Sequence, residues 1–265
     1  MVIRWVTVFL DFPPATHDAG VTFWQAVTGY GLSPARGAEG EFATLVPPSG
    51  DAYLRVQRVR AGGGCHLDLH LDPAAERDVI ERLDAAGGRI LHLGTGLVIG
   101  QSPGGFTFCL VDWTGEHAVP PPLPGGEAGD KAGAAGDTAD GEASDTARGA
   151  TRADTLCLDA PSGQFEQELA FWAGFTGQET YPAPVPGYAF LTRPPQWPVR
   201  LLLQRRDSAA PGEPVRGHVD FGCTDPGAIA RHLSLGARLV AEQPYWTVLA
   251  DPAGNEYCLV RREPV

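Results

Sequence analysis

Hydrophobic and polar residues alternate along this chain in short runs that predict strands, with two helical stretches in the first half. Residues 5–11 form an apolar run typical of a buried strand. Val21, Trp24, Gln25 and Thr28 are spaced three and four apart, which predicts a helix over about 19–28. The same patterns predict strands at 42–46, 53–59, 66–72, 89–93, 96–102 and 106–111, and a second helix over about 73–86. This order, β-α-β-β followed by β-α-β-β-β, favours a paired, mostly antiparallel α+β fold.

The predicted strand at 66–72 carries polar side chains on one face and leucines on the other. Side chains on a strand alternate faces, so the polar face holds His66, Asp68 and His70, and the apolar face holds Leu67, Leu69 and Leu71. Polar residues are unusual on a strand within so much hydrophobic sequence. We therefore expect this face of the sheet to line a wet cavity.

The second half of the chain repeats the first. Segments 155–161, 171–177, 201–206, 218–225 and 251–260 repeat, in the same order, segments 7–13, 23–29, 54–59, 66–72 and 102–111. Agreement at this many ordered points indicates a tandem duplication. We predict two similar domains, 1–114 and 154–265, each with its own cavity strand.

Residues 115–153 differ from both halves. They contain proline, glycine, alanine and acidic residues with almost no large apolar side chain. Such a segment buries too little surface to offset its ordering entropy, so we expect a flexible acidic linker. An interaction tail is the alternative.

Charge and cysteine content indicate which partners and which cellular compartment to expect. Lys and Arg number 20 against 32 Asp and Glu, a net charge of −12, which argues against nucleic-acid and anionic-membrane partners. No apolar run is long enough to span a bilayer, and the N-terminus lacks the core of a secretion signal. We expect a cytoplasmic protein, monomeric or homodimeric, whose cysteines are buried and reduced: Cys65, Cys109, Cys157, Cys223 and Cys258.

Several motifs together resemble the vicinal oxygen chelate superfamily, which holds glyoxalase I, bleomycin- and fosfomycin-resistance proteins and extradiol dioxygenases. They are the Leu-Asp strand ends at Asp11 and Asp159, the Phe-Trp helices at 23–29 and 171–177, the His-x-Asp strands, and the Asp-Pro-x-Gly-Asn segment at 251–255. The glyoxalase-like domains are the most similar branch. The resemblance implies two tandem domains, each of two paired β-α-β-β(-β) modules curled around a cleft.

The resemblance also implies one candidate metal ligand from each of four strands. In the first domain these are Thr7, Gln57, His66 and Thr107; in the second they are Thr155, Gln204, His218 and Glu256. The first set has no carboxylate, so we assign Gln57, His66 and Thr107 to ligand binding. The second set offers His218, Glu256 and Gln204 for one divalent ion (Zn, Ni, Fe or Mn), with a metal-free site as the equal alternative.

Structural roles compete with these assignments. Each cavity histidine could simply bond Asp68 or Asp220, two residues further along the same strand face. We interpret His70 as a rim residue, and Trp24 and Trp172 as core. Glu256 needs a polar partner, which could be Gln204, His218 or a structural arginine such as Arg200. Trp246, Tyr245 and Trp197 could form an aromatic pocket wall.

Three functions follow, and whether the chain is an enzyme stays open. One is a lyase or isomerase acting on a small organic molecule in the second domain, with Glu256 and His218 as catalytic residues. The second is a metal-free protein that binds an antibiotic or secondary metabolite. The third is a non-catalytic tandem scaffold, at least for the first domain. An extradiol dioxygenase is disfavoured because neither domain supplies the second histidine, and an anionic substrate is disfavoured unless a local charge such as Arg55 or Arg200 overrides the acidic pI.

Overall fold

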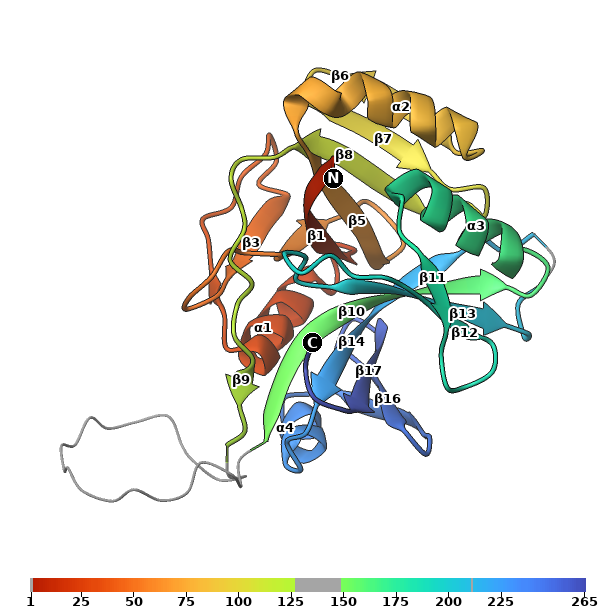
Figure 1. The fold of residues 1–265 in the computed structure, drawn as a ribbon. Coiled ribbons are helices and arrows are strands. Elements are labelled where there is room, and N and C mark those ends of the chain that lie inside the picture. Colours follow the sequence, from red (N-terminus) through yellow and green to blue (C-terminus); the bar gives the residue numbers. More distant parts are fainter. Residues whose placement is uncertain (1, 127–148, 211) are drawn as a thin grey trace.

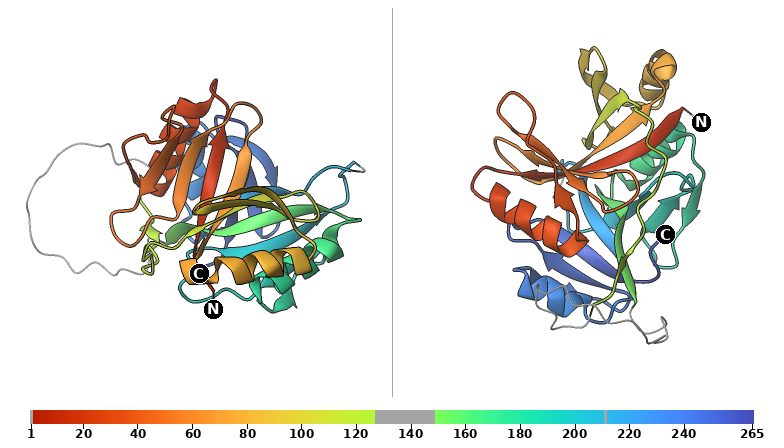
Figure 2. Two further views of the ribbon diagram at one scale, coloured as in Figure 1. Left: turned by 90° about the horizontal axis from the view of Figure 1, so that it is seen from above. Right: turned by 90° about the vertical axis from the view of Figure 1, so that its left-hand side faces the viewer.

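The computed structural model describes residues 2–126, 149–210 and 212–265. Each half of the chain forms one mixed β-sheet with helices against it, which confirms the α+β fold of two tandem domains (Figure 1). In Figure 2, α1 (His17–Thr28) lies between the strands of the first domain and those of the second, and α2 (Glu76–Ala85) lies beside α3 (Phe165–Thr176).

The first domain is an eight-stranded sheet in the order β2-β3-β4-β1-β5-β8-β7-β6. Its elements are β1 (Ile3–Phe12), α1 (His17–Thr28), β2 (Gly31–Leu32), β3 (Phe42–Val46), β4 (Leu54–Arg58), β5 (Gly64–Leu71), the 3-10 helix η1 (Pro73–Ala75), α2 (Glu76–Ala85), β6 (Arg89–Gly94), β7 (Leu97–Gln101) and β8 (Thr107–Asp112).

The second domain repeats this order as β11-β12-β13-β10-β14-β17-β16-β15, with a short extra strand, β9, on β10. Its elements are β9 (Leu123–Pro124), β10 (Ala150–Pro161), α3 (Phe165–Thr176), β11 (Thr180–Pro182), β12 (Tyr188–Leu191), β13 (Arg200–Arg206), β14 (Arg216–Cys223), α4 (Ala228–Ser234), β15 (Arg238–Glu242), β16 (Trp246–Ala250) and β17 (Glu256–Arg261).

Each sheet consists of two modules that meet at one antiparallel pair of strands. β1 pairs with β5 in the first domain, and β10 pairs with β14 in the second. Both pairings lie within the one chain. These two central pairs carry the predicted cavity strands, so each His-x-Asp strand lies in the middle of its sheet.

The predicted elements agree with the observed ones to within a few residues. The first helix begins at His17, two residues before its predicted start, and ends at Gly29 in the left-handed conformation that glycine adopts without strain. The second predicted helix begins as the 3-10 turn η1, where Asp72 accepts a hydrogen bond from the Ala74 N–H, and continues as α2. Leu67, Leu69 and Leu71 are buried as expected.

The helices also join the two domains. Trp24 of α1 stacks on Phe221 of β14 with ring centroids 5.8 Å apart and donates a hydrogen bond to Asp251 at 2.9 Å. Trp172 of α3 contacts Phe108 of β8 at the matching place, with ring centroids 5.2 Å apart and planes tilted by 59°. Both tryptophans are core residues, as predicted, but the core that they fill spans the domain boundary. Figure 1 also shows α2 beside α3, and Arg82 of α2 donates to the Phe175 carbonyl.

Both described ends of the expected linker pack on the folded domains. Asp51 accepts hydrogen bonds at 2.8 Å from the backbone N–H groups of His117 and Ala118, and β9 pairs with the start of β10. Residues 150–153 therefore belong to a strand. The rest of the predicted linker, 127–148, lies outside the described residues, so disorder there stays a prediction.

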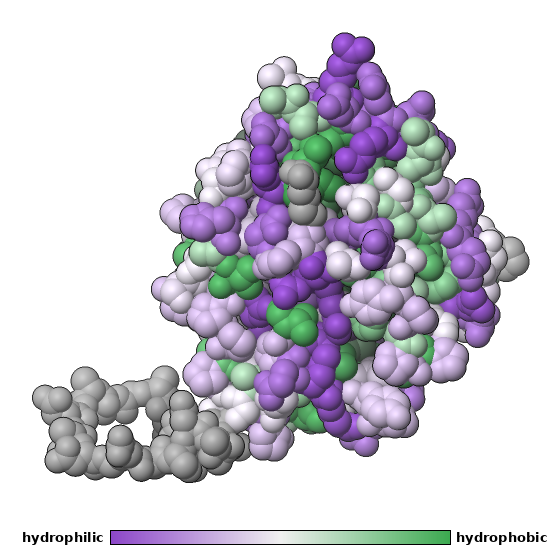
Figure 3. All heavy atoms as spheres, in the orientation of Figure 1, coloured by the Kyte–Doolittle hydropathy of each residue, from purple (hydrophilic) through white to green (hydrophobic). Residues whose placement is uncertain are grey.

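Hydrophilic and hydrophobic residues are interspersed on the face drawn in Figure 3, where hydrophobic residues form only small clusters. Within the described ranges, no helix is both long enough and apolar enough to cross a lipid bilayer.

Candidate functional site

A cavity of about 1180 Å³ is lined by both domains. It lies where β5 and β14 approach each other, and a side chain at Gly217 of β14 would collide with the Cys65 thiol of β5. Of the nine residues that the sequence analysis proposed for ligand, metal or catalytic roles, seven line it: Gln57, His66, Thr107, Gln204, His218, Trp246 and Glu256. The two expected clefts are thus two ends of one space.

His218 is held from two sides in the second-domain half of the cavity. Its Nδ1 lies 2.7 Å from Oδ2 of Asp159 on β10, and its Nε2 lies 3.2 Å from Oδ1 of Asp220 on its own strand. The Cys258 thiol of β17 lies 3.7 Å from the same Nε2. The register explains this convergence, since Cys157 pairs with His218 across β10 and β14, and Asp220 pairs with Cys258 across β14 and β17.

The charge state of His218 follows from these neighbours. Burial alone would lower its pKa, but Cys157, Asp159 and Asp220 outweigh burial and hold the pKa of His218 well above its ordinary value. Burial raises the pKa of the Cys258 thiol to about 12. Without another cation present, His218 is an imidazolium between two carboxylates and Cys258 is a neutral thiol.

The Nε2 side of His218 has the composition of a divalent-metal site. Ligand atoms of His218, Asp220 and Cys258 all lie within 4.8 Å of one another. Asp220 Oδ1 is buried, and its printed contact in the described part of the chain is the 3.2 Å ion pair with His218 Nε2, which a metal ion between the two atoms would replace. Asp159 orients the ring from Nδ1, as carboxylates do behind metal-bound histidines. One imidazole, one carboxylate and one thiolate fit zinc or a similar ion, with a coordination position left for water or substrate. The residues present therefore fit the divalent ion that the sequence resemblance implies.

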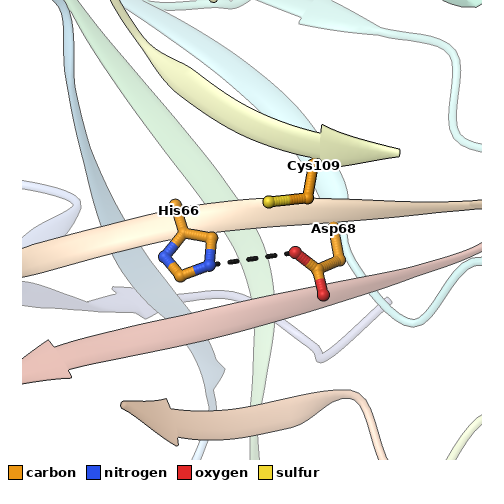
Figure 4. A group of neighbouring side chains, drawn as sticks. All are labelled: His66, Asp68 and Cys109. Atoms are coloured by element: carbon orange, nitrogen blue, oxygen red, sulfur yellow. Dashed lines mark ion pairs between the residues drawn. The ribbon is translucent and has the colours of Figure 1, made fainter. Parts of the chain in front are cut away.

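The first domain repeats this arrangement around His66. Its Nδ1 lies 2.7 Å from Asp11, its Nε2 lies 3.8 Å from Asp68, and Cys109 of β8 completes the group (Figure 4). The ring of His66 stacks on Phe9, with centroids 4.6 Å apart and planes 9° apart.

One sequence difference between the domains changes the charge beside the two candidate metal groups. Arg55 of β4 lies 3.8 Å from Asp68 and lines the first-domain end of the cavity. The corresponding position of β13 is Leu202, because Phe9 pairs with Arg55 and Cys157 pairs with Leu202. A guanidinium beside the carboxylate opposes a metal cation. The first-domain group therefore suits a cation less well than the second-domain group, where Leu202 replaces Arg55, and metal binding in the second domain stays a prediction.

Glu256, the predicted carboxylate ligand, lies on the same face of β17 as Cys258 but two residues earlier. It is exposed at the cavity and has no hydrogen-bond or ion-pair partner among the described residues. The predicted partnership with Arg200 does not form, because Arg200 donates to Thr155 and lies over the Phe190 ring. Gln204 accepts a hydrogen bond from the Cys157 thiol at 3.7 Å. The metal role predicted for Glu256 and Gln204 stays a prediction.

Of the other residues interpreted from the sequence, some lie at the cavity and some do not. His70 is not a rim residue: it is 2% exposed, bonds Thr7 at 2.8 Å, and lies outside the cavity lining. The reason is that its strand continues past the cavity into the core. Trp197 is fully buried and does not line the cavity, whereas Trp246 does and packs against Tyr188. Thr7 and Thr155, the remaining candidate ligands, bond protein groups away from the cavity lining.

Sequence reasoning missed the two aspartates that hold the histidines and the two cysteines beside them. Asp11 and Asp159 were noted only as repeated strand ends, and Cys109 and Cys258 only as buried thiols. The available signal was their presence at matching positions of both repeats, on the cavity face of each strand.

The comparisons with known proteins agree with this architecture. The signature of the family described as "Glyoxalase-like domain" matches residues 7–111 and 155–260. No curated protein matches the sequence at a significant level.

Solved structures share the fold at low sequence identity. The Mn(II)-bound glyoxalase from Novosphingobium aromaticivorans superposes with a TM-score of 0.60 at 14% identity, covering 99% of this chain and 85% of that one. The 2,2',3-trihydroxybiphenyl 1,2-dioxygenase from Sphingomonas wittichii gives a TM-score of 0.62 at 14% identity, covering 98% and 90%. A catechol 2,3-dioxygenase gives 0.57 at 13% identity, covering 100% and 90%. Together with the two matched regions and the paired modules, these similarities show that the chain belongs to the glyoxalase-like domain family of the vicinal oxygen chelate superfamily, with two domains in tandem.

Proposed function

We propose that this protein is a metal-dependent enzyme of lyase or isomerase type that acts on a small organic molecule in the second-domain half of the cavity. The observation that carries the proposal is the convergence of His218 Nε2, Asp220 Oδ1 and Cys258 Sγ beside an open cavity. The similarity to a Mn(II)-bound glyoxalase supports the same reaction class.

His218, Asp220 and Cys258 would hold one divalent ion. Such an ion polarises a bound carbonyl or lowers the pKa of a bound water. Asp159 keeps the histidine ring oriented with Nε2 toward the other two ligands. Cys258 would lose its proton on coordination, because a thiol must be deprotonated to bind a metal.

Glu256 is proposed as the general base. Its carboxylate lines the cavity, is exposed, and has no partner in the described part of the chain, so it can accept a proton from a bound substrate. The Gln204 amide oxygen accepts the hydrogen bond of the Cys157 thiol, so the N–H groups of Gln204 can donate to a substrate oxygen. Trp246 lines the cavity and would contact the apolar part of the molecule, with the Tyr188 ring packed against it.

Metal analysis of the purified full chain tests this proposal. We expect about one equivalent of Zn, Ni, Fe or Mn per chain. Asp220→Asn should lose it, because one ligand is removed, whereas the matched first-domain change Asp68→Asn should keep it. Equal loss in both variants, or wild-type protein that takes up no metal from any of the four ions, would rule the centre out.

The competing function is a metal-free binding protein. It is favoured by the ion pair of His218 with Asp220 at 3.2 Å, which satisfies the histidine without a metal. A protein that takes up none of the four ions, while its tryptophan fluorescence responds to aromatic ligands, would support the binder.

We also propose a cytoplasmic location. All five cysteines lie in the described part of the chain and are free thiols, which fits a reducing compartment.

A further inference from the structure

We propose that the first-domain end of the cavity is a separate binding site for a planar organic carboxylate, built on Arg55 and Arg36 beside Phe42. This site does not depend on a metal in the second domain.

Arg55 has unused hydrogen-bonding capacity. Its nearest acid, Asp68, lies 3.8 Å from Nη1, which is beyond hydrogen-bond distance. Its Nε is enclosed and has no partner within residues 2–126, 149–210 and 212–265. The side chain is 25% exposed and lines the cavity. A guanidinium presents its N–H groups in a fixed fork that matches a carboxylate, so a ligand carboxylate would supply the acceptors that Arg55 lacks.

Arg36 places a second positive charge at the same end of the cavity. It lines the cavity, and its only side-chain hydrogen bond among the described residues is a 3.3 Å contact to the Ser33 hydroxyl. Burial, with a further effect of the Arg55 charge, lowers the pKa of Arg36. An anion between the two guanidinium groups would offset the effect of the Arg55 charge on Arg36.

This end of the cavity is less acidic than the second-domain end. Among the described residues that line it, Arg36 and Arg55 balance the carboxylates of Asp11 and Asp68. His66 adds an imidazole that Asp11 holds at 2.7 Å. At the second-domain end, acidic groups outnumber basic ones: His218 faces the three carboxylates of Asp159, Asp220 and Glu256. The further cavity arginines, Arg206 and Arg216, pair with Glu213. A chain of net charge −12 thus places two arginines together at one end of its cavity.

Apolar side chains beside the two arginines define the rest of the ligand. Phe42 is half-buried, lines the cavity, and meets the Phe9 ring edge-on with centroids 6.1 Å apart. The Arg55 guanidinium lies 5.7 Å from the Phe9 ring centroid. Ile99 lines the cavity as well, and Gln57 adds one amide. A flat, apolar ring that carries a carboxylate matches this combination of surfaces.

Isothermal titration of the full chain with benzoate tests the site, with benzamide as the uncharged probe of the same shape. We expect benzoate to bind at least tenfold more tightly than benzamide. Arg55→Gln should weaken benzoate at least tenfold, and Arg36→Gln should weaken it less, because Arg36 is the more exposed of the two. The matched control Arg77→Gln removes an arginine of the exposed face of α2 and should leave binding unchanged.

The second-domain variant Asp220→Asn separates this proposal from the proposed metal centre. Benzoate affinity should stay within twofold of the wild type in that variant, whether or not the wild type holds metal. Loss of benzoate binding in Asp220→Asn, equal effects of Arg55→Gln and Arg77→Gln, or equal affinity for benzamide would each overturn the first-domain site.

Discussion

At the residue scale, Asp159 sets the direction in which His218 faces. Its carboxylate lies 2.7 Å from Nδ1 and is 18% exposed, so the contact is largely shielded from water. The ring is thereby fixed with Nε2 toward Asp220 and Cys258. A strong hydrogen bond behind a metal-binding histidine fixes the ring orientation and raises the basicity of the ligand nitrogen.

Asp159→Asn should therefore weaken metal binding without removing a ligand. We expect metal affinity to fall about 10- to 100-fold, the usual cost of losing such a contact. Competition with a chelating dye measures this affinity. The matched change Asp11→Asn, which acts on His66 at the same 2.7 Å, should leave it unaltered. Equal losses of metal affinity in both variants would contradict a metal site that belongs to the second domain alone.

At the residue scale, the sequence predicted which side chains face the cavity but not the direction in which each side chain points. The sequence placed His218, Gln204 and Glu256 on the cavity face, and all three line the cavity. It could not show that the His218 ring leans along its strand toward Cys258 rather than toward Glu256. That choice depends on Asp159, a neighbour 59 residues away in the chain.

At the scale of elements, α4 and β17 share a buried polar contact that connects to α1. His232 of α4 is fully buried, and its Nδ1 lies 2.9 Å from the Tyr257 hydroxyl. The rings of Phe23, Phe221 and Tyr257 surround it at 5.6–6.1 Å between centroids. Burial, with a smaller effect of the Arg231 charge, lowers the pKa of His232 to about 3.

The chain should lose stability in mild acid through His232. Its pKa is about 3 when folded and about 6.5 when unfolded, so the unfolded state binds the proton first as the pH falls below about 6.5. Between pH 7 and pH 5 this histidine alone should lower the free energy of unfolding by about 2 kcal/mol. Urea unfolding at both pH values measures the loss. His232→Gln should remove that part of the pH dependence.

The exposed His117, whose side chain is 80% exposed, provides the control. His117→Gln should keep the full acid sensitivity. If His232→Gln kept it as well, the acid sensitivity would come from groups other than His232.

Element positions were predictable because local spacing determines them. The helix motif at 23–29 gave α1 and identified Trp24 as a core residue. The partner of Trp24 was not predictable, because Phe221 and Asp251 lie in the other domain and no local pattern specifies that contact.

At the scale of the whole molecule, the two domains share one core and one cavity. Gly104 donates a backbone hydrogen bond at 2.9 Å to the buried Glu168, and Tyr53 donates to the Ala153 carbonyl at 2.7 Å. With the tryptophan contacts of α1 and α3, these bonds join the domains on two sides. Each half alone would expose large aromatic surfaces to water.

Segments 1–126 and 149–265, produced as separate chains, should therefore assemble into a one-to-one complex. Either segment alone should be unstable or aggregate, because Trp24 or Trp172 would lose its partners. Size-exclusion chromatography with light scattering measures the assembly. Two segments that each fold and remain monomeric when mixed would contradict a shared core.

The duplication made the overall architecture predictable, since the same order of elements appears twice in the sequence. The asymmetry between the halves depends on single positions. The repeat of 54–59 at 201–206 already aligns Leu202 with Arg55, but only the structure places Arg55 3.8 Å from Asp68 in the cavity lining.

The metal centre at His218, Asp220 and Cys258 is the central claim, and cobalt spectroscopy tests it most directly. Co²⁺ bound through a thiolate gives an intense near-ultraviolet charge-transfer absorption that oxygen and nitrogen ligands do not give. We predict this absorption in the cobalt-loaded wild type, its loss in Cys258→Ser and its retention in Cys109→Ser. An absorption that survives Cys258→Ser, or that never appears although cobalt binds, would contradict the proposed ligand set.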